Sequence, residues 1–241
     1  MKTAIISDIH GNATALRAVL EDIKSLSVDL IISLGDNIGY GPEPEAVVNL
    51  IREQHIPSVI GNHELAINKP KFLGWFNTNA RISLEKTKRL ISQSTIDYIS
   101  KLSYCMILNN CRFVHGFPPG SATIYLFELT ERKIKNMFAK MHEWVCFVGH
   151  THLLEIIVYD GENIYKRPLE EEDVQLNASK KYLINVGSVG QPRDGNNQAK
   201  YVVFDTSSKI LSVKYITYDI SDTVKKIYRA GLPEQHAWRL M

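Results

Sequence analysis

The chain has 241 residues, of which 44% are hydrophobic and 22% charged, and its formal net charge is +2. This composition excludes a disordered chain, and the length suffices for a hydrophobic core without disulfide support. The nearly balanced charge argues against a strongly basic surface, so we expect no clear nucleic-acid-binding face.

The N-terminus carries only the short apolar run Ala4–Ile6 before Ser7 and Asp8. Such a run is too short for a signal peptide or a membrane span, so we expect a cytoplasmic protein that does not bind membranes. The 3 cysteines show no CxxC spacing. We expect them to be reduced, buried thiols, as is usual in the cytoplasm.

Short apolar runs alternate with helical patterns in the first part of the chain. Strand patterns fall at residues 3–7, 30–34 and 57–60, and helical patterns at 12–26 and 43–53. This β-α-β-α-β order predicts a parallel sheet with helices on its faces.

The segment at about 65–103 is predicted to be a partly helical insert, with helices at 83–91 and 94–102. A loop is expected around Trp75 and Phe76. These two rings either form a lid that stacks on a base or pack in the core, and we favour core packing.

Strand patterns dominate the remainder of the chain. Asn109-Asn110 and Asp160-Gly161 predict hairpin turns. Helices are expected at 130–141 and 221–230. The expected strands cover residues 104–108, 111–114, 145–148, 155–159, 163–167, 182–186, 200–205 and 210–216. With no repeat or linker, a single domain over residues 1–241 with two packed sheets is the simplest interpretation.

Five apolar runs each end in a polar cluster of metal-ligating residue types. The clusters are Asp8-x-His10, Gly35-Asp36, Gly61-Asn62-His63-Glu64, His115-Gly116 and Gly149-His150-x-His152. Sites in open α/β sheets form just outside the carboxyl ends of the strands, so we expect these clusters to converge. Most of the 8 histidines of the chain lie in them, which random scatter would seldom produce.

The clusters offer carboxylate, imidazole and amide ligands but no thiolate, which favours Mn²⁺, Fe, Zn²⁺ or Ni²⁺ over a structural zinc site. The candidate ligands are Asp8, His10, Asp36, Asn62, His115, His150 and His152. They are too many for one open site, so we expect two divalent ions. Two such ions and two carboxylates leave the site positive, which attracts phosphate. Paired ions can also generate hydroxide and clamp an in-line displacement.

The order and spacing of these motifs, over roughly residues 3–190, resemble the calcineurin-like metallophosphoesterases. The stretches DNIGYGP at 36–42 and GSVGQPRD at 187–194 resemble a branch of small bacterial and archaeal predicted phosphodiesterases. The resemblance implies an α/β (α+β) two-sheet β-sandwich flanked by helices in four layers. It also implies hydrolysis of phosphodiesters or phosphomonoesters, with Mn²⁺ as the favoured metal.

The resemblance further implies a role for each site residue. The first ion would be held by Asp8, His10 and His152, and the second by Asn62, His115 and His150. Asp36 would bridge both ions. His63 would protonate the leaving oxygen as a general acid, and Glu64, which stands where the family usually has Asp, would orient it.

Two further residues are candidates for substrate binding. Asn12 either touches phosphate or caps the helix that begins there, and we favour capping. Arg193 either binds phosphate or forms a surface salt bridge. The expected substrate is a small phosphoester, with nucleotides among the options, and no sequence feature indicates an oligomeric state.

Three other functions compete with hydrolysis. A non-catalytic scaffold for protein binding would be expected to lose ligands or His63, and the chain retains them all. A nuclease would call for a basic groove or an added DNA-binding domain, and neither is evident. A phosphoprotein phosphatase would carry an arginine shortly after Gly35-Asp36, where residues 37–41 supply none.

Overall fold

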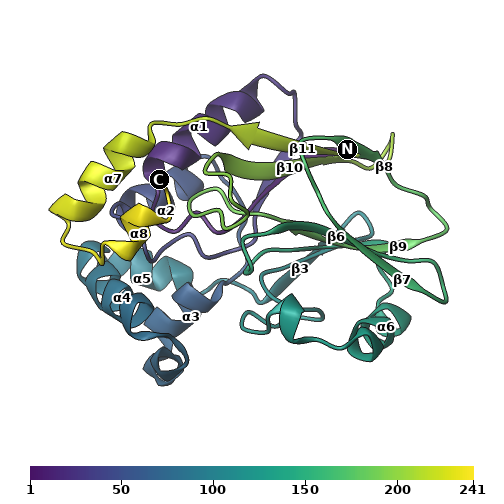
Figure 1. Cartoon of the computed structure of the whole chain (residues 1–241), viewed down its shortest axis with the longest axis horizontal. Coiled ribbons are helices and arrows are strands. Elements are labelled where there is room, and N and C mark those ends of the chain that lie inside the picture. Colours follow the sequence, from purple (N-terminus) through teal and green to yellow (C-terminus); the bar gives the residue numbers. More distant parts are fainter.

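Two mixed β-sheets form the centre of the molecule in the computed structural model, which describes residues 1–241 (Figure 1). The 5-stranded sheet has the order β2-β1-β10-β11-β8, and the 6-stranded sheet has the order β3-β4-β5-β9-β6-β7. The strands are β1 (Lys2–Ile6), β2 (Leu30–Ser33), β3 (Cys105–Leu108), β4 (Cys111–Val114), β5 (Val145–Val148), β6 (Leu154–Tyr159), β7 (Ile164–Pro168), β8 (Asp173–Gln175), β9 (Lys181–Val186), β10 (Ala199–Asp205) and β11 (Ile210–Ile216).

Helices cover the outer faces of both sheets and one end of the sandwich (Figure 1). They are α1 (Ala13–Lys24), α2 (Pro44–Glu53), α3 (Asn62–Asn68), α4 (Thr78–Leu90), α5 (Gln93–Ile99), α6 (Glu131–Lys140), α7 (Ile220–Arg229) and α8 (Gln235–Trp238), with short 3₁₀ turns at Pro70–Trp75 and Leu126–Glu128. None of these helices combines the length and the hydrophobicity that a membrane span requires.

Alternating side chains divide the hydrophobic core into layers. In β1, Ile5 packs between the two sheets against residues such as Phe147 and Phe204, whereas Ala4 and Ile6 face the cluster built with α1 and α2. Successive side chains of a strand point to opposite faces, so one strand serves two layers. On the far side, α6 packs on the 6-stranded sheet. The predicted four-layer sandwich is therefore confirmed.

The N-terminal sheet differs from the predicted β-α-β-α-β unit. β1 and β2 are parallel as expected, but the other neighbour of β1 is β10, which runs antiparallel. Residues 57–60 are not a strand. They make only the isolated bridges of Ser58 to Ser33 and of Val59 to Ser103. Pro57 has no N–H to donate, and the chain turns into α3 at Asn62, which leaves no room for a longer ladder.

Some element bounds also differ from the prediction. α4 begins at Thr78 rather than Ser83, because the Asn77 side chain accepts a hydrogen bond from the N–H of Ala80 and caps the helix. A loop was expected around Trp75 and Phe76, but a 3₁₀ turn covers Pro70–Trp75. β8 and α8 were not predicted; both are short, and α8 brings the C-terminal residues beside α4 through Ser83 and His236.

Candidate metal centre

The candidate ligands converge at one end of the sandwich. Asp8 and His10 follow β1, and Asp36 follows β2, so the 5-stranded sheet supplies three of them. The 6-stranded sheet supplies the others that follow strands, namely His115 after β4 and His150 and His152 after β5. Asn62 and His63 open α3. All of these side chains are buried, so the site lies where the ends of the two sheets meet.

One end of this cluster contains Asp8, His10 and His152. Asp8 Oδ1 lies 3.2 Å from His152 Nε2 and 3.6 Å from His10 Nε2. The two Nε2 atoms are 3.0 Å apart. Asp8 Oδ2 accepts hydrogen bonds from Ser7 Oγ at 2.6 Å and from the His150 N–H at 2.9 Å. These bonds leave Oδ1, which has no hydrogen-bond partner, aimed at the two imidazoles.

The other end contains Asp36, His115 and His150. Asp36 Oδ2 lies 3.3 Å from His115 Nε2, and His115 Nε2 lies 3.2 Å from His150 Nδ1. Asn62 Oδ1 is 3.0 Å from the same His115 nitrogen. Asp36 Oδ2 is also 3.7 Å from His10 Nε2. Asp36 therefore lies between the two ends.

Hydrogen bonds to main-chain carbonyls fix which nitrogen each imidazole presents. Nδ1 of His10, His115 and His152 faces the carbonyl oxygens of Ile38, Leu34 and Gln191 at 3.2, 2.9 and 2.5 Å respectively. A carbonyl only accepts, so Nδ1 must carry the proton and Nε2 presents its lone pair. Lone pairs and carboxylate oxygens thus face one another, an arrangement that only a bound cation or an added proton stabilises. The donor set fits divalent metal ions.

The pKa shifts of the buried side chains also indicate that the cluster needs a compensating positive charge. Burial opposes ionisation of Asp8, but the His152 and His115 imidazoles outweigh it and hold the Asp8 pKa well below its usual range. Burial alone would lower the pKa of His115, and the Asp36 and Asp8 carboxylates instead raise it to about 9. No lysine or arginine pairs with Asp8 or Asp36. Two buried carboxylates without such partners are costly unless a cation compensates them.

The backbone at the ligands is strained. Asp8, His10, Asp36, His150 and His152 have φ values of 53°, 49°, 52°, 69° and 62°. This left-handed region is uncommon for residues with a Cβ, and strain of this kind concentrates at functional sites. Gly149 illustrates the crowding, because a Cβ there would lie 2.0 Å from Ser7 Oγ and 2.5 Å from Asp8 Oδ2.

His63 belongs to neither end but forms a third close group with His10 and Asp36. Its Nε2 is 3.9 Å from Asp36 Oδ2, and its ring packs edge-on against His10, Tyr40 and Phe76. Burial lowers the pKa of His63 well below its usual value, so the ring is neutral at neutral pH in this state. Nδ1 has no hydrogen-bond partner and lies over Gly39, where an added Cβ would be 2.0 Å away.

Glu64 does not contact the His63 ring through a hydrogen bond. Its carboxylate instead accepts four main-chain N–H groups, those of Asp36, Asn37, Ile38 and Gly61, at 2.7–3.3 Å. The expectation that Glu64 orients His63 directly therefore has no support in these contacts. Burial and the Asp36 carboxylate raise the pKa of Glu64 to about 7. Glu64 joins the start of α3 to the loop that carries Asp36.

The two expected substrate-binding residues lie in different surroundings. Asn12 Oδ1 accepts from the Ala15 N–H at 3.1 Å and caps α1, and its Nδ2 donates to the Gly190 carbonyl at 3.1 Å. These bonds occupy the amide and favour the capping role. Arg193 is exposed beside the cluster and makes no ion pair, so the salt-bridge alternative is not realised.

Several residues at the site were not anticipated. The Tyr125 ring stacks on His150 with centroids 3.7 Å apart and planes at 17°, and Tyr40 packs against both His10 and His63. Gln191 supplies the carbonyl that holds His152. Tyr40 and Gln191 lie inside the two motifs at 36–42 and 187–194, which could have revealed them. Tyr125 lies in no motif.

A small cavity of about 110 Å³ opens over the cluster and is lined by Asn62, His150, Tyr125, Trp75 and Phe76 among others. Trp75 is 68% exposed, whereas Phe76 packs with the core group of α3 and α4. The expectation of core packing thus holds for Phe76 only. The cavity therefore borders Asn62 and His150 of the cluster.

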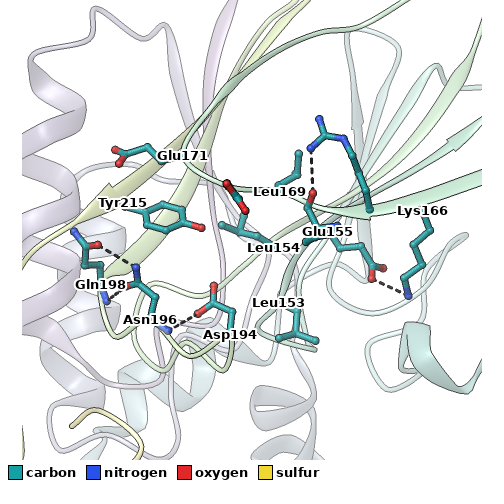
Figure 2. A pocket seen from close by; sticks show the side chains of 13 residues that line it. Leu153, Leu154, Glu155, Lys166, Leu169, Glu171, Asp194, Asn196, Gln198 and Tyr215 are labelled. Atoms are coloured by element: carbon teal, nitrogen blue, oxygen red, sulfur yellow. Dashed lines mark hydrogen bonds and ion pairs between the residues drawn. The ribbon is translucent and has the colours of Figure 1, made fainter.

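A larger cavity, of about 940 Å³, lies next to the loop at 193–198 and contains none of the candidate ligands. Figure 2 shows Glu155 and Lys166 paired on one side of it and Asp194, Asn196 and Tyr215 on the other. Its acidic side chains make it unsuited to a phosphate anion. Of these two cavities, only the smaller is lined by candidate ligands.

Comparisons with known proteins agree with this geometry. Residues 1–209 match the family model described as a calcineurin-like phosphoesterase superfamily domain. The chain is 36% identical to uncharacterized protein MJ0912 of Methanocaldococcus jannaschii, with 98% of this chain and 96% of the relative covered. A crystal structure of a metallophosphoesterase from Sphaerobacter thermophilus superposes with a TM-score of 0.85 at 37% identity, covering 100% of this chain and 98% of that one. A 61-residue stretch, 25% of this chain and 28% of the relative, is 41% identical to serine/threonine-protein phosphatase 2 of Escherichia coli.

Proposed function

Because the chain belongs to the calcineurin-like phosphoesterase superfamily, we propose that it hydrolyses small phosphomonoesters or phosphodiesters with two divalent ions, Mn²⁺ being the best suited. The proposal rests on one observation: carboxylate oxygens and imidazole lone pairs converge in a buried cluster at the ends of the two sheets. Asp8, His10 and His152 would hold one ion, and His115, His150 and Asn62 the other. Asp36 would contact both.

Bound ions supply charge stabilisation of the phosphoryl oxygens and a lowered pKa for a bound water. The residues of the chain orient the ligand atoms and supply the proton. Main-chain carbonyls hold Nδ1 of three imidazoles, which keeps their Nε2 lone pairs aimed inward without further rearrangement. The rings of Tyr125, Phe76 and Trp75 line the opening.

His63 is the residue suited to donate a proton to the leaving oxygen. Its ring is wedged between His10, Tyr40 and Phe76, so its direction is fixed. A bound phosphate brings negative charge next to the ring and raises its pKa, which opposes the lowering caused by burial. The proton would then be taken up with the substrate and delivered to the leaving oxygen.

A phosphoprotein phosphatase activity is the second candidate. It is favoured only by the 61-residue similarity to serine/threonine-protein phosphatase 2 of E. coli. The cavity over the cluster, of about 110 Å³, is small and lined by aromatic rings, which fits a small ester better than a peptide segment.

The test is hydrolysis of p-nitrophenyl phosphate, bis(p-nitrophenyl) phosphate and alkyl phosphates by the purified protein, with and without Mn²⁺. We expect metal-dependent release of phosphate or alcohol from at least one of them. His63→Ala should lower kcat on the alkyl esters by about 10²–10⁴-fold, because they need a protonated leaving group, and should spare the nitrophenyl esters more. His142→Ala, which changes an exposed histidine outside the cluster, is the control.

Absence of hydrolysis from metal-loaded protein on every ester would contradict the proposal and favour a non-catalytic scaffold. Full activity of His63→Ala on an alkyl ester would show that His63 is not the general acid. A phosphopeptide added as a further substrate separates the second candidate from the first.

A further inference from the structure

Two arginines lie together beside the Asp8 end of the cluster without a carboxylate partner. Arg193 Nη2 and Arg239 Nη1 lie 3.3 and 3.4 Å from the same Gln191 side-chain oxygen. By contrast, Arg112 pairs with Glu143 and Arg167 pairs with Glu172. Asp194, which follows Arg193 directly, is engaged by Lys200 instead. The arginine pair therefore holds uncompensated positive charge.

The pair is connected to the metal centre through Gln191 and Tyr40. The Gln191 carbonyl accepts from Nδ1 of His152 at 2.5 Å, so one residue contacts both a candidate ligand and the two guanidinium groups. Burial raises the pKa of the Tyr40 hydroxyl, while Arg193 and Arg239 oppose that rise, which places their charges near the same hydroxyl. The Tyr40 ring itself is 4.5 Å from the His10 and His63 rings.

The loop that carries Arg193 is held firmly. Lys200 Nζ, fully buried, donates to Asp194 Oδ1 at 2.7 Å and to the Asn196 carbonyl at 2.5 Å. Figure 2 shows the bonds that link Asp194, Asn196 and Gln198 in this turn. Arg239 is brought to the same place by α8, which is anchored by the buried His236 through its bond to Ser83. Two segments from different parts of the chain thus meet at one point.

We propose that Arg193 and Arg239 form an anion subsite next to the metal centre, and that it selects phosphate esters carrying a second phosphate group. This inference rests on the proposed function and narrows its substrate class. Guanidinium groups form paired, charge-assisted hydrogen bonds with phosphate oxygens, which a lysine or a neutral amide cannot reproduce. The guanidinium groups of Arg193 and Arg239 both lie within reach of the neutral Gln191 side-chain oxygen. No carboxylate competes for their N–H donors, which can therefore bind an anion.

The test uses probes that are not hydrolysed. Methylenediphosphonate carries two linked phosphonates and methylphosphonate carries one. Their affinities are measured by calorimetry on metal-loaded protein freed of excess metal. We expect the wild-type chain to prefer the diphosphonate, and Arg239→Gln and Arg193→Gln each to reduce that preference about tenfold, the loss of roughly one charge-assisted contact. Arg239→Lys should recover part of it.

The matched control is Arg229→Gln, which removes an exposed arginine of α7 that makes no ion pair, and it should leave the preference unchanged. Thermal unfolding of each variant verifies that α8 still packs. An unchanged preference in both arginine variants, or an equal weakening of both probes, would overturn the subsite. Lack of ester hydrolysis by the wild-type chain would instead contradict the proposed function, while the binding preference would still report on the arginines.

Discussion

The two ends of the buried cluster use the same donor types but support them differently. At the Asp8 end, both imidazoles are fixed by hydrogen bonds from Nδ1 to main-chain carbonyls. At the Asp36 end, His115 is fixed in this way, whereas His150 presents Nδ1 and its Nε2 has no protein partner. Stacking on Tyr125 sets the plane of the His150 ring, but a hydrogen bond restrains its rotation better. We therefore expect the Asp8 end to bind its cation more tightly.

The largest effect is expected from Asp36→Asn, because Asp36 lies between the two ends. The variant should lose metal at both ends and slow ester hydrolysis by at least about a hundredfold. Metal content by mass spectrometry and initial rates measure the two effects. Asp173→Asn, at an exposed position of β8, is the control. Full metal content in Asp36→Asn would show that the two ends do not share this carboxylate.

His152→Ala and His150→Ala test whether the Asp8 end binds its cation more tightly than the Asp36 end. Calorimetric titration of the metal-free wild-type chain with Mn²⁺ should show a tighter and a weaker class of sites. Removing His152 should weaken the tighter class, and removing His150 the weaker one, by about 10–100-fold each. If His150→Ala abolished the tighter class instead, the hydrogen bonds to Nδ1 would not be what distinguishes the ends.

A smaller effect, on stability, is expected from Glu64→Gln. The amide would turn N–H donors toward some of the four main-chain N–H groups that Glu64 now accepts. We expect a loss of about 1–3 kcal/mol in the free energy of unfolding, measured in urea. Glu85→Gln on the exposed face of α4 should change little. A loss confined to the metal-loaded protein would contradict this structural role and indicate direct action on the ions.

Much of the site was predictable because its residues lie close in sequence to the ends of strands. Asp8, His10, Asp36, His115, His150 and His152 each follow an apolar run within a few residues, and the carboxyl ends of such strands meet. The same pattern predicted two sheets. It did not predict that β10 would pair with β1, because that pairing joins residues about 200 positions apart and leaves no local trace.

Residues that act through packing escaped prediction for a related reason. Glu64 looked like a partner of His63 from its position, but its side chain turns back toward the main chain of the Asp36 loop. Tyr125 and Arg239 come from segments without motif or periodicity, and only the folded chain places them beside His150 and Gln191. Contacts set by tertiary structure override local pattern.

The origin of the ligands in two different sheets has a mechanical consequence. Asp8 and His10 extend from β1, while His152 extends from β5 of the opposite sheet, so an ion bound by all three is attached to both layers. Any sliding or tilting of one layer against the other would break metal–ligand bonds. A bound metal ion should therefore hold the two sheets together. The rigidity of the whole molecule would then depend on how much metal it has bound.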